Sequence, residues 1–184
     1  MVQWHELGLA LTVSVNIGAR QLQQAHFSQR LTALLVRHPG VAADCLELEI
    51  LETSAMEDLA QVFQAIRECQ ALGVRFALDD FGTGYSSLTH LRHLPAEVIK
   101  IDQSFVRDML EDADDLAIVK GVIGLAGVFH RAVIAEGVET AAHGTLLMAL
   151  GCDQAQAYAI ARPMAAADLP AWVASWRGIG DWMA

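Results

Sequence analysis

The hydrophobic residues of the chain gather in six short runs, rich in β-branched side chains, that recur along its length. The runs are Leu11–Val15, Leu46–Ile50, Val74–Leu78, Val98–Ile101, Ala132–Ala135 and Ala155–Ile160. Each run contains or is followed by a polar residue that a buried strand does not need, and successive polar residues are 20 to 34 positions apart. This spacing is close to the ~30 residues of a βαβ unit, so the pattern predicts six parallel strands.

The stretches between the runs have the pattern of helices. One carries an apolar face at helical spacing, follows the capping-box sequence Ser54–Glu57 and is ended by Gly73. The residues of that face are Met56, Leu59, Val62, Phe63 and Ile66. Further helices are predicted over Leu116–Phe129, Thr140–Leu150 and Ala167–Trp176.

Alternating strands and helices fit both an open doubly wound sheet and a closed (β/α)8 barrel. The polar residues favour the barrel, because they recur at the carboxyl end of every strand rather than at one switch point. The sequence contains no glycine-rich dinucleotide fingerprint and no phosphate-binding P-loop. We therefore expect an α/β fold, a (β/α)8 TIM-like barrel that is incomplete, with about six of eight strands in one domain over residues 1–184. The other two strands are expected upstream of Met1.

Composition narrows the possible functions. The net charge of −10 argues against a sequence-independent nucleic-acid binder, so no DNA partner is expected. Cys45, Cys69 and Cys152 are far apart and the seven histidines show no ligand spacing, which argues against zinc sites and disulfides. Apolar runs stay well below the ~20 residues of a membrane helix, and the N-terminus lacks a signal peptide. We expect a cytoplasmic protein, and attachment of the full-length form to the inner membrane stays open.

The polar residues at the strand ends form a set of oxygen donors. Asp79 and Asp80 are adjacent at the end of a buried strand, where two unpaired carboxylates would repel each other and lose solvation. The full set is Asn16, Glu49, Asp79, Asp80, Asp102 and Glu136. Oxygen-only ligation favours Mg²⁺, Mn²⁺ or Ca²⁺, and five carboxylates suggest two ions bridged by Asp79 or Asp80.

Two metal ions close together are a known device for hydrolysing phosphodiesters. Lys100 lies two residues before Asp102, so both side chains face the same side, where the lysine can contact a phosphate or the attacking water. Taken singly, each acid has a simpler explanation as a helix cap or a surface residue. Their recurrence at successive strand ends favours a shared site.

These residues lie in motifs that resemble, in order and spacing, the bacterial EAL domain from about Leu9 onward. The motifs are Val15–Gln21, Leu48–Glu52, Asp79–Ser87, Lys100–Asp102, Ala135–Thr140 and Gln156–Tyr158. The resemblance implies a modified (β/α)8 barrel that hydrolyses the second messenger cyclic di-GMP to pGpG with Mg²⁺ or Mn²⁺. Upstream sensor or cyclase domains are a further possibility that it implies for the full-length protein.

The resemblance also assigns roles to single residues. It implies that Asn16, Glu49 and Asp79 bind one metal ion, and that Asp79, Asp80 and Glu136 serve the second with support from Asp102 and Gln156. Glu136 would be the general base and Lys100 would assist at the attacking water. Glu52 would anchor the loop Asp80–Ser87, which borders a homodimer interface, and Glu139 would lie in the outer pocket.

The chain departs from the family pattern in one major way: it contains no Glu-Ala-Leu segment, whose glutamate is a metal ligand in the family. Ala157 also replaces a usual glycine beside Gln156. Three functions therefore stay open: a cyclic di-GMP phosphodiesterase, a module that binds cyclic di-GMP or a protein without turnover, and a generic two-metal hydrolase. The motif match favours the first.

Overall fold

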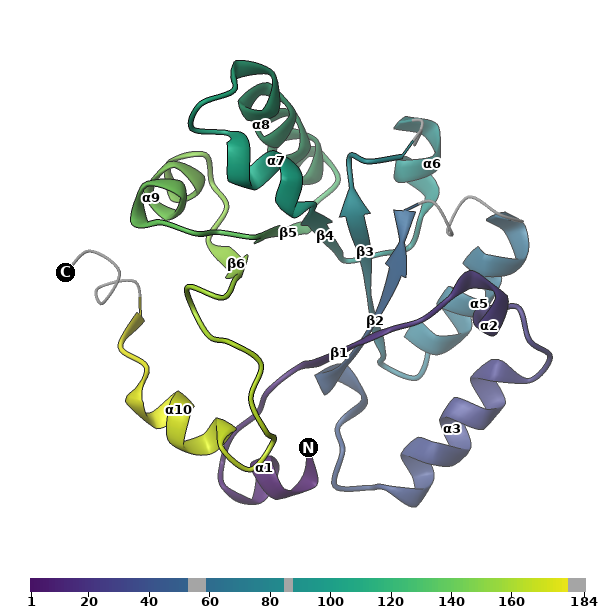
Figure 1. Cartoon of the computed structure of the whole chain (residues 1–184). Coiled ribbons are helices and arrows are strands. Elements are labelled where there is room, and N and C mark those ends of the chain that lie inside the picture. Colours follow the sequence, from purple (N-terminus) through teal and green to yellow (C-terminus); the bar gives the residue numbers. More distant parts are fainter. Residues whose placement is uncertain (53–58, 85–87, 179–184) are drawn as a thin grey trace. The chain divides into compact units, whose positions relative to one another are not determined.

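The computed structural model describes residues 1–52, 59–84 and 88–178. The chain forms two compact units, Met1–Ile99 and Lys100–Ala184, and in each of them strands alternate with helices (Figure 1).

The first unit is built on three parallel strands, β1 (Val13–Asn16), β2 (Leu46–Leu51) and β3 (Arg75–Phe81), which pair in sequence order. Its helical segments are α1 (Val2–Glu6), α2 (Ala19–Leu22), α3 (Phe27–Arg37), the 3-10 turn η1 (Ala43–Cys45), α5 (Leu59–Gln70) and α6 (Leu88–His93). Parallel strands need such crossovers, because each chain segment must return to the same end of the sheet before the next strand begins.

Helix α5 packs its apolar face on the sheet. Val62 and Ile66, one turn apart, are fully buried, and the helix contacts β3, where Phe76 is fully buried as well. Burial of each such side chain contributes ~1.5–3 kcal/mol. The capping-box sequence Ser54–Glu57 predicted before this helix lies outside the described residues. Gly73, predicted to end it, has φ +94°, a value that favours glycine.

The second unit contains β5 (Ala132–Glu136) and β6 (Gln154–Gln156), which pair in parallel, and β4 (Val98–Ile101) crosses from the first unit into it. Its helices are α7 (Gln103–Asp108), α8 (Ala113–Val128), α9 (Ala141–Ala149) and α10 (Leu169–Ser175). Side chains cap three of these helices: Asp102 caps α7, Asp112 caps α8 and Thr140 caps α9. Helix α8 contacts both α7 and β5 in this unit.

The structure confirms all six predicted strands but shifts several ends. The last one is wrong in extent: β6 ends at Gln156, because residues from Ala157 form a turn in which its carbonyl accepts from the amides of Ile160 and Ala161. An apolar composition alone does not show where strand pairing stops. Strand β3 runs on to Phe81, so the acidic pair lies inside the strand rather than after it.

Three further features concern the described residues. No helix there is long and apolar enough to cross a bilayer. The three cysteines are free thiols; Cys69 and Cys152 are buried, whereas Cys45 is only partly buried. Helix α3 was not predicted individually, although Phe27, Leu31 and Leu35 recur at helical spacing.

Candidate functional site

Three of the predicted metal ligands lie on one face of the first unit's sheet. The register pairs Asn16 with Glu49 and Leu51 with Asp79. Side chains two residues apart on a strand share a face, so Glu49, Leu51 and the residues opposite them point the same way. Glu49 and Asp79 are only 7% and 8% exposed, whereas Asn16 is exposed. The first unit therefore gathers two buried carboxylates and an amide near the carboxyl ends of its strands.

Asp80 occupies an unusual backbone conformation next to this group. Its φ is +54°, in the left-handed region that aspartate tolerates better than most residues, and it is half-buried. The chain then turns at Gly82, where φ is +106°. The chain therefore turns two residues after Asp80, at a glycine.

Glu52 holds the start of the segment Asp80–Ser87. Its carboxylate is buried, and Oε2 accepts from the amides of Gly82 at 2.9 Å and Gly84 at 3.2 Å. A Cβ on Gly84 would lie 3.0 Å from Cδ and Oε1 of Glu52, so a larger residue would push the carboxylate away. Residues 85–87 lie outside the described part of the chain, and the role of this segment in dimerisation stays a prediction.

In the second unit, Lys100 and Glu136 form a close ion pair. Lys100 is on β4 and only 2% exposed, and Glu136 is the last residue of β5. The Nζ of Lys100 lies 2.6 Å from Oε1 of Glu136. A buried ammonium is stable only beside a compensating anion, so the two groups hold each other at neighbouring strand ends. The pair places a proton acceptor next to a fixed positive charge.

Lys100 pairs with Glu136, whereas Asp102 pairs with Ser104. Its Oδ1 accepts from the backbone amide of Ser104 at 2.9 Å and also from the Ser104 hydroxyl, so it caps α7. This capping is the simpler explanation that a single acid at a strand end allows. The predicted contribution of Asp102 to metal binding therefore has to coexist with its role as a cap.

Glu136, Glu139 and Gln156 line one cavity of about 630 Å³ in the second unit. The wall also contains Tyr158 and Arg162, whose guanidinium lies 5.6 Å from the centre of the tyrosine ring. The backbone holds the two strands together at this cavity, since the amide of Gly137 donates to the carbonyl of Gln156 at 2.9 Å. Of these groups, the aromatic ring and the guanidinium suit a ligand that combines a base with a phosphate.

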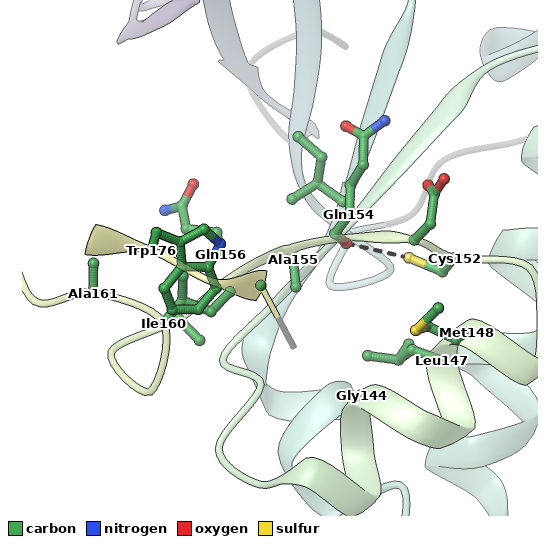
Figure 2. A pocket seen from close by; sticks show the side chains of 14 residues that line it. Gly144, Leu147, Met148, Cys152, Gln154, Ala155, Gln156, Ile160, Ala161 and Trp176 are labelled. Atoms are coloured by element: carbon green, nitrogen blue, oxygen red, sulfur yellow. Dashed lines mark hydrogen bonds between the residues drawn. The ribbon is translucent and has the colours of Figure 1, made fainter. Parts of the chain in front are cut away.

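A second, more apolar cavity of about 600 Å³ lies beside strand β6 and helix α9 (Figure 2). Leu147 and Met148 contribute from the helix, and the thiol of Cys152 donates to the carbonyl of Gln154 at 3.4 Å. Gln156 is the predicted site residue in its lining, and Ala157 lines both cavities. The residue that departs from the family pattern therefore lies between the two spaces.

Sequence reasoning did not single out several residues that shape this region. Gln103 lies against Gly137, Arg162 lines the cavity of Glu136, and His143 is buried with partners on both ring nitrogens. Arg162 lies six residues after Gln156, close enough in the sequence to have been considered together with the motif of that residue. His143 carries no such signal, because its partners are a backbone carbonyl 36 residues away and a hydroxyl of its own helix cap.

Comparison with known proteins gives a consistent result. A family model described as EAL domain matches residues 1–163. The chain is 39% identical over 162 residues to the bifunctional diguanylate cyclase/cyclic di-GMP phosphodiesterase MucR of Pseudomonas aeruginosa, covering 88% of the chain and 24% of that protein. The chain spans only 20–29% of the length of MucR and the other curated relatives with comparable similarity.

Solved structures agree with the sequence match. The c-di-GMP complex of the PaMucR phosphodiesterase superposes with a TM-score of 0.86 at 38% identity, covering 92% of this chain and 68% of that one. The manganese/cy-diGMP complex of Klebsiella pneumoniae BlrP1 gives a TM-score of 0.79 at 27% identity, covering 88% and 42%. These matches confirm the predicted fold class, an α/β fold with part of a TIM-like barrel.

Proposed function

The chain belongs to the EAL domain family, and from that premise we propose that it hydrolyses cyclic di-GMP to linear pGpG at a two-metal site in bacterial signalling. The observation that carries the proposal is the 2.6 Å pair of Lys100 and Glu136 at adjacent strand ends. Such a pair offers both a base for an attacking water and a positive charge for a phosphate.

The donor set fits hard divalent cations. Buried carboxylate oxygens of Glu49 and Asp79, with the amide oxygen of Asn16 on the same sheet face, are ligands that Mg²⁺ and Mn²⁺ prefer. We assign these three residues to one ion, and Asp79, Asp80 and Glu136 to a second, with Asp102 and Gln156 in support. When bound, such ions provide a nucleophile at neutral pH and neutralise developing charge on the phosphate.

The chain's own residues then perform three tasks. Glu136 accepts the proton of the attacking water, and Lys100 contacts the phosphate oxygen that gains charge. The cavity that Glu139, Tyr158 and Arg162 line supports the assignment of a nucleotide ligand, because a ring face and a guanidinium suit a purine and a phosphate. We also propose a homodimer through the segment Asp80–Ser87, whose start Glu52 anchors.

The second candidate is a module that binds cyclic di-GMP without turnover. The two functions share the ligand and differ only in chemistry, so one set of measurements separates them.

The test combines product detection with binding. The chain is incubated with cyclic di-GMP and Mn²⁺, and pGpG is quantified by liquid chromatography, while calorimetry measures binding of the dinucleotide. We expect turnover by the wild type and a loss of ~10²–10⁴-fold in kcat for Glu136→Gln, the range typical of a general base. Binding without pGpG supports the non-hydrolytic module, and absence of both overturns the proposal. Glu111→Gln, at an exposed position, serves as the matched control and should leave turnover unchanged.

A further inference from the structure

We propose that His143 is a positioning residue that fixes the distance between Lys100 and Glu136. The inference rests on the proposed function for its catalytic meaning, but its structural part does not depend on turnover. His143 lies in the first turn of α9 and is only 5% exposed.

Both ring nitrogens of His143 have partners in the second unit. Nε2 lies 3.0 Å from the carbonyl oxygen of Arg107, and Nδ1 lies 2.7 Å from the hydroxyl oxygen of Thr140. A carbonyl oxygen can only accept, so Nε2 must carry a proton and donate to it. In the neutral ring Nδ1 then accepts from the Thr140 hydroxyl, and the same hydroxyl oxygen accepts from the His143 backbone amide at 3.4 Å.

The two partners of His143 belong to two successive strand–helix segments, β4–α7 and β5–α9. Arg107 lies in the last turn of α7, and this helix begins at the cap Asp102, two residues after Lys100. Thr140 is the cap of α9, four residues after Glu136. A histidine that joins the end of one helix to the start of the other therefore ties the segment carrying Lys100 to the segment carrying Glu136.

A second contact locks the same two segments at the other end of α7. A Cβ on Gly137 would lie 2.7 Å from Cβ of Gln103, the first residue of that helix, so the loop after Glu136 is in close contact with it. Helix α7 is thus held against the β5–α9 loop at its first turn by packing and at its last turn by His143. Loss of the histidine bridge would remove the attachment at the last turn of α7.

The chain offers an unusually clean readout, because it contains only two lysines. Lys100 is buried in the ion pair and Lys120 is exposed on α8. Competitive acetylation followed by mass spectrometry gives the ratio of their reactivities, with Lys120 as an internal standard. This ratio reports the state of the Lys100–Glu136 pair without metal, substrate or turnover.

The experiment compares His143→Leu, which removes both hydrogen bonds, with His143→Gln, whose amide can still donate to Arg107 and accept from Thr140. We expect His143→Leu to raise the Lys100 to Lys120 ratio by about tenfold, the factor that corresponds to loss of the one buried hydrogen bond that joins the two segments, from His143 to Arg107. His143→Gln should restore most of the protection. Val62→Ala, which removes a fully buried side chain of the first unit, controls for general destabilisation and should leave the ratio unchanged.

Turnover provides the second readout. His143→Leu should lower kcat by about tenfold or more with little change in KM, because misplaced reacting groups impair chemistry rather than binding. An unchanged lysine ratio in His143→Leu, or an equal rise in Val62→Ala, overturns the inference. If the wild type lacks turnover but the ratio changes as expected, the proposed function fails while the positioning role stands.

Discussion

Gly137 gives the sharpest prediction, because both its backbone and its surroundings demand glycine. Its φ is +70°, and an added Cβ would meet Cβ of Gln103 at 2.7 Å and its Cα at 3.3 Å. A left-handed conformation costs a non-glycine residue ~1–2 kcal/mol. Forcing a methyl group into a filled space adds ~1–3 kcal/mol. Gly137→Ala should therefore lower the free energy of unfolding by ~2–5 kcal/mol.

Two other glycines separate these contributions. Gly151 has φ +93° but no atom within 4 Å of an added Cβ, so Gly151→Ala should cost only the backbone share, ~1–2 kcal/mol. Gly121 lies within α8, also with open space, so Gly121→Ala should stabilise by ~0.5–1 kcal/mol.

The assay is thermal unfolding followed by circular dichroism, where 1 kcal/mol corresponds to a shift of ~2–4 °C for a chain of this size. From the most to the least stable protein, the expected order is Gly121→Ala, wild type, Gly151→Ala and Gly137→Ala. Equal losses for Gly137→Ala and Gly151→Ala would refute the close contact with Gln103, and with it the second attachment of α7.

Two further predictions concern buried groups in the first unit. Glu52→Gln should lower the free energy of unfolding by ~1–3 kcal/mol, because the Glu52 carboxylate accepts two backbone hydrogen bonds. The exposed control Glu111→Gln should change it by less than ~0.5 kcal/mol, and equal thermal shifts for the two variants would contradict the prediction. Burial raises the pKa of the Cys69 thiol to about 11, with a smaller contribution from the charge of Glu68, so iodoacetamide at pH 8 should modify Cys45 well before Cys69. If peptide mass mapping finds Cys69 modified as fast as Cys45, the result would contradict the burial of the Cys69 side chain.

The strands could be predicted from the sequence because apolar, β-branched runs mark them directly. Lys100 and Asp102 were expected to face one side from strand alternation alone. Periodicity could not foresee that Glu136 would be the ion partner of Lys100 while Asp102 turned to Ser104, since side-chain pairing depends on how neighbouring strands and caps meet.

The limits of sequence reasoning are clearest at the end of β6 and at His143. The run Ala155–Ile160 is apolar throughout most of its length, yet its second half forms a turn, because pairing with β5 ends at Gln156. The spacing of the histidines gave no reason to single out His143, and its bridge to Arg107 is visible only in the folded second unit, where α7 and α9 meet. Long-range contacts to backbone atoms leave no residue-type pattern to find.

Hydrolysis of cyclic di-GMP in H₂¹⁸O tests the central claim most directly. Attack of water on phosphorus places one oxygen from solvent in the new phosphate of pGpG, which mass spectrometry detects. We predict one ¹⁸O per pGpG in the presence of Mn²⁺, loss of product with excess EDTA, and a strong loss of product in Glu136→Gln. Bound cyclic di-GMP that stays intact with Mn²⁺, or product that forms equally in Glu136→Gln, would contradict the account.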